Sequence, residues 1–247
     1  MNYYLLLALI LFVYMNFWYL ISLIKKRNDI ADIAWGLGFI LLSWSSAFLS
    51  QNFGYRSILA NLLVTIWGLR LTLHIYQRNH KKTEDYRYLS FKYPYFQVYI
   101  LQGILLYLTV FPVLFINKNS IYFFGILDVL GLIIWTIGFY FEVVGDAQLK
   151  KFVQNPKNKG KIIQSGLWRY SRHPNYFGEV TQWWGIFLFA LSIPTGFQTI
   201  IGPITITVLI LFVSGIPLLE KKYANNSEFQ IYKYKTSKFF PLPPKIK

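Results

Sequence analysis

The chain has 247 residues, of which 55% are hydrophobic, 20% aromatic and only 14% charged. Soluble domains carry about 25% charged residues, so this composition indicates a protein that lies largely in lipid. The absence of cysteine excludes disulfides, thiol chemistry and a cysteine-ligated zinc site, and the spacing of His74, His80 and His173 predicts no histidine-based metal site. The formal net charge of +15 alone would allow binding to nucleic acid or to a membrane surface.

Seven apolar stretches are long enough to cross a bilayer, which requires roughly 20 helical residues. Their expected boundaries are Tyr3–Ile24, Ile33–Leu49, Ile58–Tyr76, Tyr95–Ile116, Ile121–Val144, Tyr176–Ile193 and Thr199–Pro217. The sequence therefore predicts an all-α, multi-pass membrane protein of about seven helices, with residues 1–247 in a single integral membrane domain. The first stretch is too long for the apolar region of a signal peptide and is expected to be a retained span.

Lysine and arginine residues are concentrated in alternate loops. Of the 25 such residues, all but Arg56, Arg70 and Lys118 follow the first, third or fifth stretch or lie in the C-terminal tail. The positive-inside rule then predicts that the N-terminus is outside and the C-terminus in the cytosol. The net charge is thus explained by topology, and no nucleic-acid partner is expected.

Residues 166–179 combine two arginines, a histidine, an asparagine, two tyrosines and a glutamate directly before the sixth apolar stretch. Pro174 suits the first turn of a helix, where its missing N–H costs nothing. A helix that begins there places Asn175 and Glu179 on one face. The alternative interpretation is a charged interfacial loop before an ordinary membrane helix, because interfaces are rich in arginine and tyrosine.

Charged side chains inside predicted spans are costly and are therefore functional candidates. Glu142 and Asp146 are four residues apart, so they share a helix face and are expected to pair with cations or with donors from a ligand. Arg70 and Arg78 belong to a polar stripe on the third stretch, and Asp32 lies at the start of the second. The alternative is that these acids pair with arginines only to seal the helix bundle.

The loop after the third stretch contains Glu84-Asp85-Tyr86-Arg87-Tyr88. This loop is either part of a functional site or a solvated loop with local ion pairs. Further along the chain, Gln102 and Gly103 predict either a buried polar contact or a close approach of two helices.

The acids adjoin a dense basic loop between Lys150 and Arg172. Arginine and lysine suit phosphate groups, whereas asparagine and carboxylates suit hydroxyls and amides, so a nucleotide cofactor at the cytosolic membrane surface would use both. No GxGxxG, P-loop or GxSxG pattern is present. The chemistry is therefore expected to belong to a bound cofactor.

The stretch from Gly166 to Glu179, with Trp183 after it, resembles the C-terminal domain of membrane steroid 5α-reductases and their bacterial relatives of unassigned substrate. The resemblance includes residues 101–103 and 138–146 and is strongest over residues 100–247. Residues 172–176 are also similar to the sterol C14- and C7-reductases. A shorter Arg-His-Pro-x-Tyr-x-Gly pattern occurs in isoprenylcysteine carboxyl methyltransferases, which use S-adenosylmethionine.

The reductase resemblance implies seven transmembrane helices, NADPH as the cofactor, and hydride transfer to a carbon–carbon double bond conjugated to a ketone in a steroid- or isoprenoid-like lipid. The cofactor-binding residues expected on this basis are Arg70, Arg78, Glu142, Asp146, Lys161, Arg169, Arg172, His173, Asn175, Tyr176, Glu179 and Tyr223. Glu142 departs from the animal enzymes, which have asparagine there. Their tyrosine and glutamine–glutamate pair have no evident counterparts, so Asp32, Tyr86 and Tyr88 are the local catalytic candidates.

Two other functions remain open from the sequence. A methyltransferase of the isoprenylcysteine type would bind a sulfonium and an adenosine, for which so many basic residues are unnecessary. A non-enzymatic lipid-binding protein or transporter would be expected to show inverted repeats or a helix broken at the membrane midplane, and the sequence shows neither. The sequence predicts an integral membrane protein, which in a bacterium would lie in the cytoplasmic membrane. Its cofactor site is expected on the cytosolic side.

Overall fold

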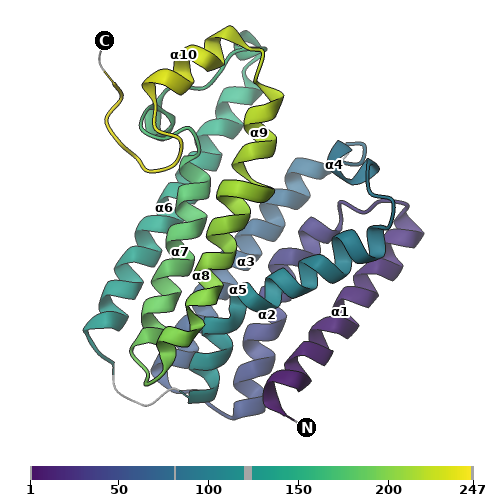
Figure 1. Ribbon diagram of the computed structural model, residues 1–247, viewed down its shortest axis with the longest axis vertical. Coiled ribbons are helices and arrows are strands. Elements are labelled where there is room, and N and C mark those ends of the chain that lie inside the picture. Colours follow the sequence, from purple (N-terminus) through teal and green to yellow (C-terminus); the bar gives the residue numbers. More distant parts are fainter. Residues whose placement is uncertain (1, 81, 120–123, 246–247) are drawn as a thin grey trace. The chain divides into compact units, whose positions relative to one another are not determined.

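A computed structural model of the protein describes residues 2–80, 82–119 and 124–245, the Tyr86 side chain excepted (Figure 1). Within these ranges the chain forms helices and no β-strand. The helices are α1 (Tyr3–Lys25), α2 (Ala31–Ser50), α3 (Tyr55–Asn79), α4 (Tyr86–Leu89), η1 (Tyr95–Ile100), α5 (Leu101–Asn119), α6 (Ile126–Gln154), η2 (Pro156–Asn158), η3 (Gly166–Arg169), α7 (Pro174–Leu191), η4 (Gly196–Ile200), α8 (Ile201–Val208), η5 (Leu209–Val213), α9 (Ile216–Lys222) and α10 (Ser227–Lys235).

Among the described residues, six helices are long and apolar enough to cross a membrane. They are α1, α2, α3, the continuous η1–α5 helix, α6 and the segment from η4 to α9. The predicted all-α, multi-pass membrane fold is confirmed. The sixth predicted stretch forms α7, an 18-residue helix that is more polar than these six because it carries Asn175, Glu179 and Gln182. The orientation of the chain across the membrane stays a prediction.

The fifth predicted span extends further than the sequence indicates. It was expected at Ile121–Val144, whereas α6 runs from Ile126 to Gln154, and residues 121–123 lie outside the described part of the chain. At 1.5 Å per residue its 29 residues are about 43 Å long, which exceeds the bilayer's hydrocarbon thickness of about 30 Å. Asp146 therefore lies within the helix, eight residues before its end.

The last predicted span, Thr199–Pro217, is not one regular helix. After α8 the chain makes the π-helical turn η5 and bends at Ser214 and Gly215 before α9 begins. The amides of both bend residues donate to the carbonyl of Leu209, at 2.9 and 3.2 Å. Pro217 has no N–H to continue the helical pattern.

The chain folds into two compact units, which we describe separately. The first unit comprises Met1–Asp128 and Phe189–Gly202, and the second comprises Val129–Leu188 and Pro203–Lys247.

In the first unit, α2 packs against α1, α3 and α5. The backbones of α2 and α3 approach closely because both carry glycine where they meet: a Cβ on Gly36 would lie 2.7 Å from the carbonyl oxygen of Gly68. Small residues at such positions let membrane helices pack through their backbones.

Polar side chains join the same helices inside the first unit. Asn61 of α3 and Asn117 of α5 exchange amide hydrogen bonds of 3.2 and 3.1 Å, and Ser43 of α2 donates to Asn61. Arg56, at the start of α3, forms a two-pronged ion pair with Asp128 at 2.6 and 2.8 Å. All five side chains are buried, so the pairing of each group offsets the cost of removing it from water.

In the second unit, α6 and α7 pack through glycines spaced seven residues apart. A Cβ on Gly138 would lie 2.6 Å from the carbonyl oxygen of Gly178, and one on Gly185 would lie 2.7 Å from that of Gly131. A seven-residue spacing keeps the glycines on one helix face. This close approach brings the polar residues on the facing sides of the two helices into contact.

Candidate functional site

A hydrogen-bonded chain in the first unit joins Asp32, Tyr88 and Gln102. The Tyr88 hydroxyl donates to Oδ1 of Asp32 and accepts a hydrogen bond of 3.3 Å from Nε2 of Gln102. The three residues come from α2, α4 and α5 respectively. The structure thus brings together two of the predicted catalytic residues, Asp32 and Tyr88. The side chain of the third, Tyr86, lies outside the described residues.

Two arginines surround the same carboxylate. Nη2 of Arg87 lies 3.2 Å from Oδ2 of Asp32 and 2.8 Å from Asp85, and Nη2 of Arg78 lies 3.9 Å from Asp32. Arg78, predicted to bind the cofactor, lies beside the Asp32 cluster in this structure. Burial opposes ionisation of Asp85, but the hydrogen bonds from Arg87 outweigh it and lower the pKa of this carboxyl.

Tyr88 is buried, and burial followed by the charge of Asp32 raises the pKa of its hydroxyl well above the usual value. The group therefore stays a neutral phenol, which can donate a hydrogen bond, at physiological pH.

The short helix α4 is held in place by the loop between α1 and α2. Arg27 pairs with Asp29 at 2.8 Å and donates to the carbonyl oxygen of Lys82, also at 2.8 Å. The amide of Asp85 donates to Asp29 at 3.3 Å, and the amide of Asn28 donates to Glu84. These bonds fix the loop that carries Tyr88.

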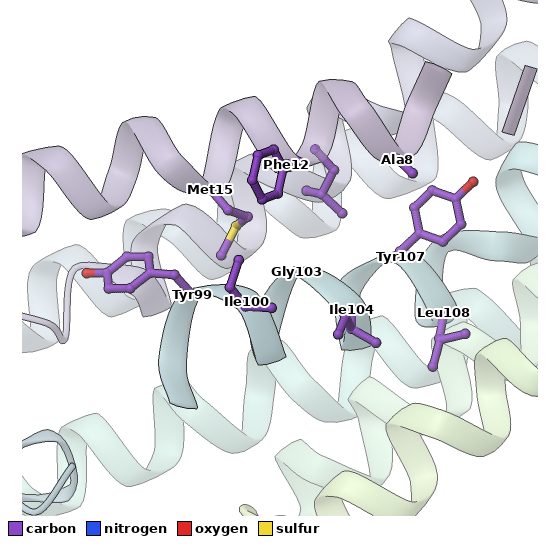
Figure 2. A pocket seen from close by; sticks show the side chains of 10 residues that line it. Ala8, Phe12, Met15, Tyr99, Ile100, Gly103, Ile104, Tyr107 and Leu108 are labelled. Atoms are coloured by element: carbon purple, nitrogen blue, oxygen red, sulfur yellow. The ribbon is translucent and has the colours of Figure 1, made fainter. Parts of the chain in front are cut away.

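An apolar groove of about 250 Å³ lies between α1 and α5 in the first unit. Figure 2 shows Phe12 and Met15 of α1 beside Gly103 and Ile104 of α5, with Tyr107 towards one end. The Tyr107 hydroxyl bonds to the carbonyl oxygen of Tyr4, so it adds no free polar group. The groove suits a hydrocarbon chain.

A second polar cluster lies between α6 and α7 in the second unit. Nδ2 of Asn175 donates to Oδ1 of Asp146 at 2.9 Å, and Nε2 of Gln182 donates to Oε2 of Glu142 at 2.5 Å. The helix start predicted at Pro174 is confirmed, as is the shared face of Glu142 and Asp146.

Two amide oxygens of this cluster are acceptors without a partner in the described part of the chain. Oδ1 of Asn175 and Oε1 of Gln182 are both buried, and neither has a hydrogen-bond partner among the described residues. A buried acceptor without a partner is costly, so each oxygen is suited to receive an N–H or O–H from a bound molecule.

The segment before α7 is fixed to α6 and to the C-terminal tail. The Trp168 indole donates to the carbonyl oxygen of Gly145 at 3.0 Å, and the Tyr232 hydroxyl donates to the carbonyl oxygen of Trp168. Ser171 donates through its hydroxyl to the carbonyl oxygen of Phe239 at 2.7 Å. The C-terminal tail therefore acts as a strap across the start of α7.

Arg172 and His173 are at the centre of this strap and are buried. Arg172 pairs with Glu220 at 2.8 Å and donates to the carbonyl oxygens of Lys233 and Thr236 at 3.0 and 2.7 Å. Nε2 of His173 lies 3.1 Å from the same glutamate. In this structure both predicted cofactor ligands bind the protein itself. Burial lowers the pKa of His173, and its bond to Glu220 only partly opposes that effect.

The remaining predicted cofactor residues are dispersed. Tyr176 stacks on the His173 ring with centroids 5.9 Å apart, and Tyr223 packs against Phe229 at 5.6 Å. The other four predicted residues lie in a loop or on a helix face. They are the exposed Lys161 and Arg169 in the second unit, the partly exposed Glu179 of α7, and the partly exposed Arg70 of α3 in the first unit.

Sequence reasoning missed Gln182 and did not assign Gln102 or Glu220 to a site. Gln182 lies seven residues after Asn175, a spacing that puts both on one face of α7 and could have identified it. The strap gave no such signal, because Arg172 meets residues about sixty positions later in the chain.

The second-unit cluster combines hydrogen-bonding groups of the kinds that nucleosides use. Carboxylates accept from ribose hydroxyls, and the free amide oxygens can accept from a carboxamide or an adenine amino group. These groups fit the nicotinamide nucleoside of NADPH, and they also fit S-adenosylmethionine. For phosphates, the exposed Lys161 and Arg169 are accessible, whereas Arg172 is already fully engaged.

A protein-family profile described as "Protein of unknown function (DUF1295)" matches residues 18–236. An uncharacterised protein of Schizosaccharomyces pombe is 25% identical over an alignment of 273 residues, which covers 94% of this chain and 78% of the relative. The probable O-methyltransferase ustE of Ustilaginoidea virens is 46% identical over 46 residues, only 19% of this chain and 16% of the relative. No solved structure matches significantly. Neither relative's name mentions a reductase.

Proposed function

The chain belongs to the DUF1295 family of membrane proteins, and we propose that it is an NADPH-dependent reductase of a carbon–carbon double bond conjugated to a ketone in a lipid. The family description names no activity, so the proposal rests on this chain's own side chains and on their resemblance to the membrane steroid 5α-reductases.

The observation that carries the proposal is the Tyr88 hydroxyl held between Asp32 and Gln102. Reduction of an enone places negative charge on the ketone oxygen, which a positioned neutral phenol stabilises by donating a hydrogen bond. Methyl transfer to a carboxylate or thiol needs no such acid. The Tyr88 cluster therefore favours the reductase over the methyltransferase.

In the proposed role the hydroxyl hydrogen of Tyr88 turns away from Asp32. Rotation about the Tyr88 C–O bond turns its hydrogen from Asp32 towards a substrate oxygen, while Gln102 continues to donate to the phenol oxygen. Asp32 then keeps Arg87, at 3.2 Å, as its partner. The apolar groove between α1 and α5 would accommodate part of the substrate's hydrocarbon.

In the second unit, Asp146, Asn175, Glu142 and Gln182 would hold the nucleoside part of NADPH, with Lys161 and Arg169 near its phosphates. The bound cofactor supplies a hydride. The protein's own contribution is to orient the nucleoside through the two free amide oxygens and the two carboxylates.

The cofactor assignment is tested by thermal shift of the detergent-purified protein with NADPH, NADH and S-adenosylmethionine. We expect NADPH to raise the melting temperature, and Asn175→Ala to abolish that shift while leaving the melting temperature without ligand nearly unchanged. Asn225→Ala, at an exposed position, is the matched control and should retain the shift. A shift with the methyl donor alone would overturn the proposal.

The role of Tyr88 is tested separately with Tyr88→Phe, which removes only the hydroxyl. The variant should retain the NADPH-induced shift but lose NADPH oxidation in the presence of an enone sterol or enone isoprenoid, by about 10²-fold or more. Equal oxidation by the variant and the wild type would exclude Tyr88 as the acid.

A methyltransferase is the second candidate, and the short match to a probable O-methyltransferase favours it. Glu142 and Asp146 would then face the sulfonium of S-adenosylmethionine. Transfer of a labelled methyl group from this donor to an extracted lipid, with Tyr88→Phe fully active, would establish this function instead.

A further inference from the structure

The C-terminal end of the second unit has an exposed surface that mixes basic and apolar side chains. It comprises Ile231, Lys233, Tyr234 and Lys235 of α10 together with Lys238, Phe240, Leu242 and Lys245 of the tail. We call it the basic–aromatic surface. Figure 1 shows α10 in yellow, followed by the tail that curls back beside it.

The end of the tail is joined to α10. The amide of Lys245 donates to the carbonyl oxygen of Lys235 at 2.9 Å, and the Lys245 ammonium lies 5.6 Å from the centre of the Tyr234 ring. Further along the tail, the amide of Leu242 donates to the carbonyl oxygen of Tyr170 at 3.0 Å. Hydrogen bonds therefore fix the backbone of the tail at two points along the basic–aromatic surface.

Packing within the second unit accounts for only part of these apolar side chains: the Phe240 ring meets Phe177 of α7 at 6.0 Å but stays largely exposed. Packing of α10 uses Phe229 and Tyr232, which are 5% and 2% exposed. Ile231, Tyr234 and Phe240 are 58%, 63% and 63% exposed. The positive-inside rule explains the lysines but places no demand on their apolar neighbours.

The chain itself keeps this surface near the membrane. The last candidate span ends at Lys222 and α10 begins at Ser227, so the connection can extend at most about 18 Å. Tyrosine and phenylalanine are favoured at the level of the lipid headgroups, and lysines close to anionic lipid are attracted to it. Protein interfaces, by contrast, are depleted in lysine, which makes up half of this surface.

We propose that the basic–aromatic surface binds the anionic lipid surface of the membrane that the spans cross. The lysines contact phosphate groups, and the side chains of Ile231, Tyr234, Phe240 and Leu242 insert among the headgroups. The membrane thereby fixes α10 and the strap. This inference is independent of the proposed reductase activity.

The test compares the full chain in nanodiscs of phosphatidylcholine alone with nanodiscs that also contain phosphatidylglycerol, by hydrogen exchange of residues 227–245. We expect exchange to slow by about tenfold in the anionic nanodiscs and to recover at high salt, which screens the attraction. Replacing Lys233, Lys235, Lys238 and Lys245 by glutamine should abolish the slowing.

The matched control replaces the exposed Lys25, Lys26, Lys82 and Lys92 by glutamine, an equal loss of charge in the first unit. It should retain the slowing. Ile231→Ser combined with Tyr234→Ser keeps all the lysines and should weaken the effect in part. The proposal fails if lipid composition makes no difference, or if the control loses the slowing as completely as the test variant does.

Discussion

Arg172 has a structural role in this protein, although an arginine at a membrane surface can also bind phosphate. The family resemblance predicts that it binds the cofactor, yet its side chain pairs with Glu220 and donates to two backbone carbonyls. A guanidinium is suited to this task because its five donors lie in a fixed plane. In this role Arg172 positions the start of α7, and with it Asn175.

We predict that Arg172→Lys lowers the stability of the protein, because an ammonium cannot reach Glu220, Lys233 and Thr236 together. Leaving buried acceptors unpaired costs about 1–3 kcal/mol. The measurement is the melting temperature in detergent. Arg169→Lys is the matched control, since Arg169 is exposed, and an equal loss in both variants would contradict the strap.

His173 predicts a dependence of stability on pH. Because burial lowers its pKa in the folded protein, the unfolded chain binds a proton more readily, and stability falls as the pH drops below about 6.5, the ordinary value for histidine. The melting temperature of the wild type should decrease between pH 7 and pH 5.5. His173→Gln should show a shallower decrease over that range, and an unchanged slope would refute the assignment.

Side-chain spacing predicted part of the site, and interactions distant in sequence account for the rest. The four-residue separation of Glu142 and Asp146 was sufficient to place them on one face. The partners of Arg172 depend on how the tail folds back, and Arg56 pairs with Asp128 72 positions away. No local pattern reports such interactions, so neither pairing could be predicted.

At the scale of elements, the glycines of α6 and α7 determine how closely the two helices approach. A Cβ on Gly178 would overlap backbone atoms of Gly138 and Glu142, which cannot move aside as a side chain can. The packing is therefore intolerant of even one methyl group. It also sets the separation of the Asp146–Asn175 and Glu142–Gln182 pairs.

Gly178→Ala should lower the melting temperature substantially, since overpacking costs about 1–3 kcal/mol and here the obstacle is backbone. Gly103→Ala is the comparison, because its Cβ would meet only the flexible Met15 side chain, at 3.2 Å. We expect a small change there. Helix propensity favours alanine at both positions, so a similar loss in both variants would show that the close approach of α6 and α7 is not the cause.

The helices themselves were largely predictable, because apolar runs of this length have few alternatives in a membrane. The break at Ser214 and Gly215 could not be predicted. Glycine and proline, here Gly215 and Pro217, are common in membrane helices, and a π-helical turn has no sequence signature of its own. The polar residues of α7 are evident in the sequence, but the apolar second half of this stretch led to the prediction of a membrane span.

For the whole molecule, the distribution of lysine and arginine predicts the orientation, and the lack of cysteine makes it easy to test. Gln51, Ser90 and Asn225 lie in exposed connections between helices, so each can be replaced singly by cysteine. Gln51→Cys should react with an impermeant maleimide in intact cells, whereas Ser90→Cys and Asn225→Cys should react only after permeabilisation. Labelling of Ser90→Cys in intact cells would reverse the predicted topology.

The glycine packing between α6 and α7 also bears on how the chain is made. Because α7 carries Asn175, Glu179 and Gln182, it is a poor substrate for insertion into a bilayer by itself. α6 emerges from the ribosome first and presents Gly131, Gly138 and their polar neighbours to the incoming helix. We therefore expect α7 to enter lipid only as the second arm of a hairpin with α6, so that biogenesis depends on the same surface that shapes the site.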